Sequence, residues 1–134
     1  MVNYLDYAAT TPVHPEVLEV ITKEMSSFGN PSSVYRIGRE QKQKIERVRK
    51  AILKELQASP HDAIIFTSSG SEGNNLVFES IREHFAKEKG HIIVSAVEHP
   101  SVRKSAEFLA QEGFEVTYLA PNREGSVEVS AVEK

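Results

Sequence analysis

Residues 64–75 read IIFTSSGSEGNN. The apolar run that opens this stretch is bordered by Pro60 and by a cluster of small polar residues, a pattern that predicts a short buried strand of the parallel type. An amphipathic helix is expected after the turn, because apolar residues recur at helical spacing at Leu76, Val77, Ile81 and Phe85. The stretch therefore predicts a strand, a tight turn and a helix start in immediate succession.

This succession is a common way to bind an anion. The first turn of a helix leaves several N–H groups unpaired, and the helix dipole favours negative charge there. Gly70 allows a ligand to approach the backbone, and further donors come from the hydroxyls of Thr67, Ser68, Ser69 and Ser71. From these residues we infer a phosphate site at the turn.

A plain helix start explains the same residues and is, on composition alone, the more common case. Ser69 and Glu72 have the spacing of a capping box, in which a hydroxyl accepts from the helix and the glutamate reaches back. No Gly-Lys-Ser/Thr follows Gly70 at Walker A spacing, and the dinucleotide fingerprint Gly-x-Gly-x-x-Gly is absent from the stretch. A phosphate bound here would belong to a ligand other than ATP or NAD.

Composition places the chain among soluble globular proteins. It has 134 residues, of which 40% are hydrophobic and 26% charged, and its formal net charge is −3. That charge gives no general attraction to nucleic acid or anionic lipid. No stretch has the length of a membrane span or the pattern of a signal peptide, and the chain has no cysteine. We expect a cytoplasmic protein without nucleic-acid or membrane partners.

Periodicity elsewhere predicts an α/β fold with parallel strand pairing. Helices are expected from Pro15 toward Phe28, at about 34–56, at about 72–88 and between Ser101 and Gly113. Buried strands are expected at residues 91–95 and 114–119, and a short strand at Val127 and Val129 leads into a last helix. Strands that alternate with helices indicate a mostly parallel sheet.

Two further features have a functional and a structural interpretation. The helix at 34–56 carries seven basic residues between Arg36 and Lys50, but no aromatic residues interleave with them, so a solvated face is favoured over a nucleic-acid surface. His99 follows the strand at 91–95, at the sheet edge where open α/β folds bind ligands. A lone histidine is more often structural, and His14, His61, His84 and His91 form no pair with metal-ligand spacing.

Several motifs in register resemble pyridoxal-phosphate-dependent cysteine desulfurases of the NifS/IscS type, in the class V aminotransferase superfamily. These motifs are YLDYAATTP at 4–12, FGNPSS at 28–33, TSSGSEGNN at 67–75, the dipeptide Glu98-His99, and GFEVTYL at 113–119. The resemblance implies the N-terminal part of a fold-type I large domain, a three-layer α/β/α structure that is incomplete in this chain. Residues 1–33 would form an arm, a helix and the Asn-Pro turn, and residues 34–134 the start of the cofactor-binding domain.

The resemblance also implies the site. Gly70 and Ser71 match the pair that holds the 5′-phosphate of pyridoxal 5′-phosphate, and His99 matches the histidine that stacks on its ring. The family converts L-cysteine to L-alanine and an enzyme-bound persulfide, which a sulfur-acceptor protein takes up for iron–sulfur cluster or thio-cofactor biosynthesis. Ser69, Tyr35 and Asn74 depart from the usual glycine, histidine and aspartate of the family, and these departures loosen the assignment to a subfamily.

No catalytic residue of the family has a match in the chain. The Schiff-base lysine and the nucleophilic cysteine belong to later segments, and the nine lysines here lie outside that motif, at positions 23, 42, 44, 50, 54, 87, 89, 104 and 134. We therefore expect the chain alone to be inactive, and to be the N-terminal portion of a homodimeric enzyme. In the family fold the strand at 63–67 pairs only with later strands, and each unpaired buried backbone group costs about 1–3 kcal/mol.

Two other functions remain open from the sequence. The segment could belong to a related fold-type I enzyme, such as a selenocysteine lyase or an aminotransferase, which only the later segments distinguish. It could also be a non-catalytic phosphate-binding or interaction module.

Overall fold

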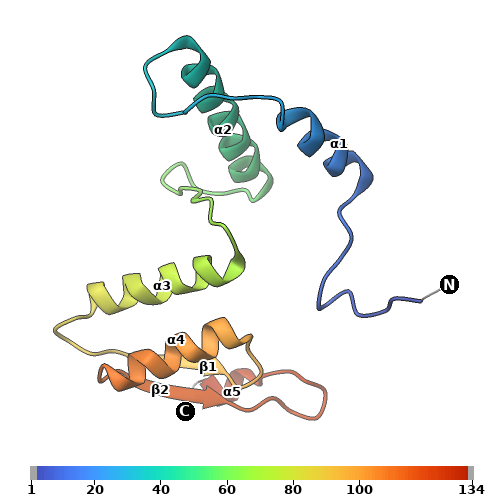
Figure 1. Ribbon diagram of the computed structural model, residues 1–134. Helices are drawn as coiled ribbons and strands as arrows, with labels where there is room; N and C mark the ends of the chain where they lie inside the picture. Colours follow the sequence, from blue (N-terminus) through green and yellow to red (C-terminus); the bar gives the residue numbers. More distant parts are fainter. Residues whose placement is uncertain (1–2, 133–134) are drawn as a thin grey trace. The chain divides into compact units, whose positions relative to one another are not determined.

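The computed structural model describes residues 3–132, and its chain divides into two compact units, Met1–Ile64 and Ile65–Lys134. Each unit is described by itself (Figure 1). The division predicted from the sequence, with an arm at 1–33 and the start of a cofactor-binding domain at 34–134, stays a prediction. The two compact units reflect contacts within this chain, and such contacts do not show which larger domain a segment belongs to.

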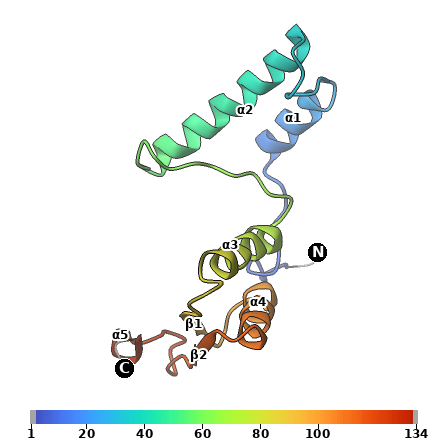
Figure 2. The same cartoon turned by 90° about the vertical axis from the view of Figure 1, so that its left-hand side faces the viewer.

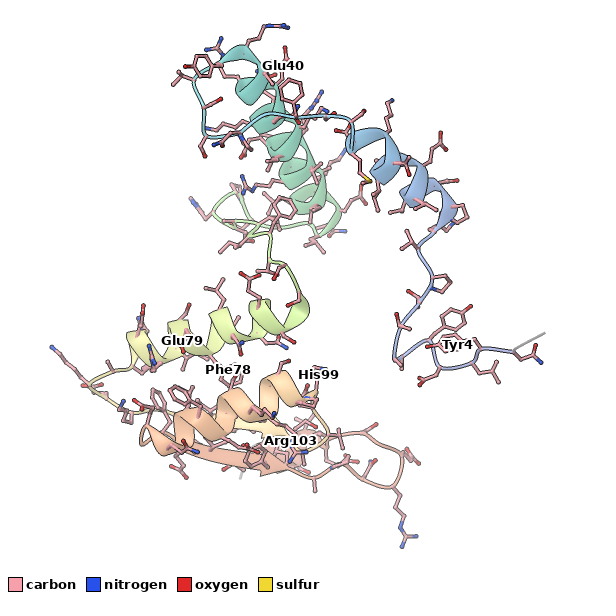
Figure 3. All side chains as sticks on the ribbon, in the orientation of Figure 1. Tyr4, Glu40, Phe78, Glu79, His99 and Arg103 are labelled. Carbon is pink, nitrogen blue, oxygen red and sulfur yellow. The ribbon has the colours of Figure 1, made fainter. Side chains whose placement is uncertain are left out.

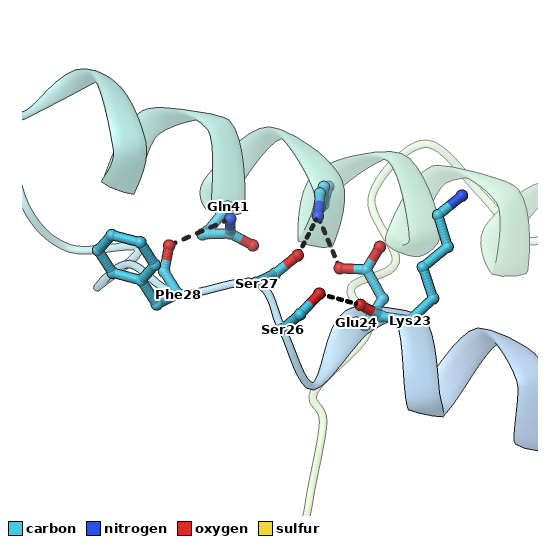
Figure 4. Close-up of polar contacts among 7 residues, drawn as sticks. Lys23, Glu24, Ser26, Ser27, Phe28 and Gln41 are labelled. Carbon is cyan, nitrogen blue, oxygen red and sulfur yellow. Dashed lines mark hydrogen bonds and ion pairs between the residues drawn. The ribbon is translucent and has the colours of Figure 1, made fainter.

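The first unit contains helices α1 (Pro15–Glu24) and α2 (Arg36–Glu55). Pro15 occupies the first helical turn of α1, where its missing N–H costs no hydrogen bond. The segment after α1 is tied to α2 by Lys44, whose Nζ lies 2.6 Å from Glu24 Oε2 and 3.2 Å from Ser27 Oγ (Figure 4). These contacts are exposed to solvent, which screens them, so they add little to stability.

Gly38 fixes how the Asn-Pro turn meets α2. It is the buried residue of this helix, and a Cβ at this position would lie 2.1 Å from Ser33 Oγ and 2.3 Å from the Asn30 carbonyl oxygen. The same carbonyl accepts a hydrogen bond from the Ser33 amide at 3.0 Å. Only a glycine allows the helix and the turn to approach this closely.

The second unit contains α3 (Gly70–His84), β1 (His91–Ser95), α4 (Pro100–Gln111), β2 (Glu115–Leu119) and α5 (Val129–Val132). Strands β1 and β2 pair in parallel, with His91 opposite Glu115 and Ser95 opposite Leu119. The connecting helix α4 packs on both strands and against α3 (Figure 2). The core of this unit lies between α4 and the sheet and is formed by Val94, Ala106, Leu109 and Phe114.

The strands predicted at 91–95 and 114–119 are confirmed, the second as Glu115–Leu119. Gly113 ends α4 as predicted: it follows the C-cap residue Glu112, and its φ of +94° favours glycine. Helix α3 ends at His84, earlier than the predicted residue 88, and its end is capped by Phe85. Among residues 3–132, no helix is both long enough and apolar enough to cross a membrane.

Two predicted strands are wrong. Residues 63–67 form no strand, and Ile65 and Phe66 are 68% and 50% exposed. The described sheet consists of β1 and β2 alone, so the apolar run has no neighbour with which to form a ladder, and a strand cannot exist without one. The short strand predicted at Val127 and Val129 is also absent: Val127 has no regular secondary structure, and Val129 is the first residue of α5.

Replacing Gly38 with alanine tests the close approach of the turn to α2. Alanine is favoured over glycine in a helix by about 1 kcal/mol, but the overlap with backbone oxygen forces a shift that costs about 1–3 kcal/mol. We expect a lower urea midpoint and faster amide hydrogen exchange at Ser33. Gly73→Ala in α3 is the matched control, because its Cβ would meet only Thr67 Oγ1 at 3.6 Å; equal effects of both variants would contradict the argument.

Candidate functional site

The start of α3 is closed by the predicted capping box. Ser69 has an extended backbone, and its Oγ accepts a hydrogen bond from the Glu72 amide at 3.2 Å. The Glu72 carboxylate reaches back and accepts from the amide of Ser68, one residue before the cap. The Gly73 amide donates to the Ser69 carbonyl at 3.1 Å, which begins the regular helical pattern. The structural interpretation of this stretch is thus confirmed.

The cap leaves the donors of Gly70 and Ser71 unused. Within residues 3–132, the amides of Gly70 and Ser71 and the Ser71 hydroxyl have no protein acceptor. Thr67 Oγ1 is engaged, because it donates to the Ser69 carbonyl at 3.0 Å. A Cβ at Gly70 would meet no protein atom within 4 Å, so the space over this residue is open. Capping and anion binding are therefore compatible at this helix start.

His99 caps the neighbouring helix. Its Nδ1 accepts a hydrogen bond from the Ser101 amide at 3.1 Å and lies 2.9 Å from Ser101 Oγ, which fixes the ring at the start of α4 (Figure 3). Residues of α3 and α4 line an open hollow of about 630 Å³ beside His99. Ser71 and His99 both line it, together with Asn75 and Lys104. The structure thus brings the hydroxyl at the start of α3 and the imidazole to one site.

Polar contacts between α3 and α4, which we did not predict from the sequence, hold this site together. Asn74 Nδ2 donates to Ser101 Oγ at 2.9 Å, and Ser105 Oγ donates to Asn75 Oδ1 at 2.8 Å. The available sequence signal was weak: Ser101 and Ser105 are four residues apart, which places them on one face of α4. Their partners on α3 are not evident from spacing.

The other histidines of the second unit, His84 and His91, do not line the hollow. His91 Nε2 is 2.8 Å from Thr117 Oγ1 across the two strands, a contact that supports the sheet. In the part of the chain between residues 3 and 132, no group of three His, Asp or Glu side chains is arranged to hold a metal ion.

Two basic residues of α2 form ion pairs within their own helix, Arg36 with Glu40 at 2.9 Å and Arg49 with Glu46.

The pKa of Glu72 is held below its ordinary value of 4.5 by hydrogen bonds from the Ser68 side chain and then the Ser68 amide. A carboxyl group whose pKa is lowered by folding adds stability above its unfolded pKa, and this stability is lost as the pH falls through the folded pKa. The capping box should accordingly open below pH 4.5 and stay closed at neutral pH.

We expect this opening to appear in the backbone signal of Ser68. In an NMR titration, the Ser68 amide should shift with a midpoint below 4.5, together with loss of protection in the first turn of α3. Glu72→Gln keeps an acceptor oxygen but cannot titrate, so it should remove the shift while preserving the turn. A Ser68 titration that persists in this variant would assign the effect to another group.

Comparison with known proteins agrees with the motifs. The family described as aminotransferase class-V matches residues 3–134. A protein of Dictyoglomus turgidum named cysteine desulfurase IscS is 44% identical over 132 residues, which cover 98% of this chain and 33% of that protein. An Escherichia coli protein of the same name is 40% identical over 134 residues, covering 97% of this chain and 33% of its own length.

Solved structures give the same result. A structure described as SspA in complex with cysteine has a TM-score of 0.88 and 39% sequence identity, and the match covers 98% of this chain and 38% of that one. A NifS-like protein has a TM-score of 0.89 and 34% identity, with coverages of 99% and 36%. The resemblance to cysteine desulfurases and the fold-type I α/β architecture are thereby confirmed, and the chain spans about a third of the length of the curated relatives it matches. The protein belongs to the aminotransferase class-V family.

Proposed function

We propose that the chain forms the phosphate cradle and the ring-stacking histidine of a pyridoxal-phosphate-dependent cysteine desulfurase. The complete enzyme would convert L-cysteine to L-alanine and an enzyme-bound persulfide, for iron–sulfur cluster or thio-cofactor biosynthesis. One observation carries the proposal: the unused donors of Gly70 and Ser71 stand at a helix start, and Ser71 shares its hollow with His99.

The cradle is suited to the phosphate dianion. Two backbone N–H groups and one hydroxyl lie at the N-terminus of α3, where the helix dipole is positive, and charge-assisted hydrogen bonds to a phosphate are stronger than neutral ones. The Glu72 carboxylate on the same turn is negative like the phosphate and therefore disfavours its binding. This carboxylate accepts a hydrogen bond from the Ser68 amide, which engages it in the capping box.

His99 supplies the second contact. Its ring is fixed through Nδ1, so the imidazole can present a flat face to an aromatic ring held in the hollow. When bound, the cofactor supplies an electron sink for bond cleavage at the substrate. The residues of this chain would bind and orient it.

The remaining chemistry requires groups from outside these residues. The chain contains no cysteine, so the persulfide thiol of the proposed enzyme is not among these residues. None of the nine lysines matches the family's Schiff-base motif, so that lysine is also proposed to lie outside these residues. A sulfur-acceptor protein and a second subunit complete the proposal, and a cytoplasmic location is the expected setting.

A chimera tests the cradle inside a working enzyme. Residues 3–134 would replace the matching segment of the Dictyoglomus turgidum desulfurase, and bound pyridoxal phosphate and alanine formed from L-cysteine would be measured. We expect the chimera to bind the cofactor, and Ser71→Ala to weaken that binding about 10- to 100-fold, since a hydrogen bond to a charged group is worth about 1.5–3 kcal/mol.

Ser80→Ala in the chimera is the matched control. Ser80 lies on the same helix, and its hydroxyl is bound to the Leu76 carbonyl at 2.8 Å instead of being free. Cofactor binding should therefore be unchanged. A folded chimera without cofactor, or equal affinity in the Ser71→Ala variant, would refute the proposed cradle.

A further inference from the structure

Three side chains form a hydrogen-bonded chain from α3 to the imidazole of His99. The Asn74 amide nitrogen donates to Ser101 Oγ at 2.9 Å, and Ser101 Oγ lies 2.9 Å from His99 Nδ1. The Ser101 backbone amide donates to the same ring nitrogen at 3.1 Å. Asn74 and Ser101 are half-buried, whereas the imidazole is exposed in the hollow.

Which group donates in each of these hydrogen bonds follows from the chemistry of the groups. A backbone N–H can only donate, so Nδ1 must accept with its lone pair and cannot carry a proton in the neutral ring. The Asn74 amide group also donates, which occupies a lone pair of Ser101 Oγ and leaves its single hydrogen for Nδ1. The neutral imidazole therefore carries its proton on Nε2, which has no hydrogen-bond partner among residues 3–132.

We propose that Asn74 and Ser101 are positioning residues that hold His99 in the Nε2–H tautomer. They present to the hollow a ring nitrogen that donates a hydrogen bond. The tautomer is a property of the protein without a ligand. That the Nε2–H group donates a hydrogen bond to a bound pyridine ring or substrate rests on the function proposed above. Ser101 lines the hollow, but its hydroxyl is engaged by Asn74 and His99, and both residues act through the imidazole.

Asn74 sets the orientation of the Ser101 hydroxyl because the Asn74 amide group can donate to the hydroxyl oxygen. An aspartate at this position only accepts, so it would take the hydrogen of Ser101 Oγ. The hydroxyl oxygen would then offer Nδ1 a lone pair instead of a hydrogen. The Ser101 backbone amide would still donate to Nδ1, but the hydroxyl would no longer do so, and the share of the Nδ1–H tautomer of the neutral ring would rise.

The ¹⁵N chemical shifts of the two ring nitrogens report the tautomer directly, since a protonated and an unprotonated nitrogen resonate far apart. The measurement uses the 134-residue chain without cofactor, at a pH where titration shows His99 to be neutral. In the wild type we expect Nδ1 to be unprotonated. Asn74→Asp and Ser101→Ala should each raise the share of the Nδ1–H tautomer, and for Ser101→Ala the ratio should change about fivefold, the value of one neutral hydrogen bond.

Two variants separate this mechanism from a general disturbance. Asn75→Asp places the same new charge one residue along α3, where Asn75 Oδ1 already accepts from Ser105 and still can after the change. This control should leave the His99 shifts as in the wild type. Ser101→Thr keeps a hydroxyl and should restore the wild-type tautomer.

The proposal is overturned if wild-type Nδ1 carries the proton, or if Asn74→Asp and Ser101→Ala leave the ring shifts unchanged. It is also overturned if Asn75→Asp changes the tautomer ratio as much as Asn74→Asp does. A separate addition of pyridoxal phosphate tests the proposed function. Failure to bind it, with the tautomer shifts as expected, would reject the cradle and leave the role of Asn74 and Ser101 intact.

Discussion

The site depends on how the first turn of α3 distributes its backbone donors. A helix start has several N–H groups without helical partners. Here the Glu72 amide is bound by Ser69 and the Ser68 amide by the Glu72 carboxylate, while the Gly70 and Ser71 amides have no acceptor within residues 3–132. A fully satisfied cap would stabilise the helix and leave nothing for a ligand. This cap stabilises the helix and keeps donors available.

The second half of the site is positioned by packing. Ala106, Leu109 and Phe114 bury the inner face of α4 against the parallel strands, and this packing fixes where the helix begins. His99 stands at that beginning, so its place follows from the core and not from contacts of its own. The pairs Asn74–Ser101 and Asn75–Ser105 then fix α3 on α4 beside the hollow. Burial sets the position of the site, and hydrogen bonds set its details.

Much of this could be predicted from local patterns. Strands at 91–95 and 115–119, the capping box and the glycine cap of α4 follow from residues close in sequence, whose physics is largely independent of the rest of the fold. The strand predicted at 63–67 is absent because a strand requires a neighbour, and the family resemblance implies that its neighbours are later strands. The contact between Asn74 and Ser101 was missed for a related reason: 27 residues separate them, and only the packing of α3 on α4 brings them together.

The most direct measurement is an amide NMR titration of the ¹⁵N-labelled chain with pyridoxal phosphate, compared with pyridoxal, which lacks the phosphate. The account predicts that the largest phosphate-dependent shifts occur at the amides of Gly70 and Ser71, with smaller shifts at His99. It would be contradicted if these amides did not respond, or if the phosphate-dependent shifts were centred on the basic surface of α2 lined by Arg39, Lys42, Arg47 and Lys50.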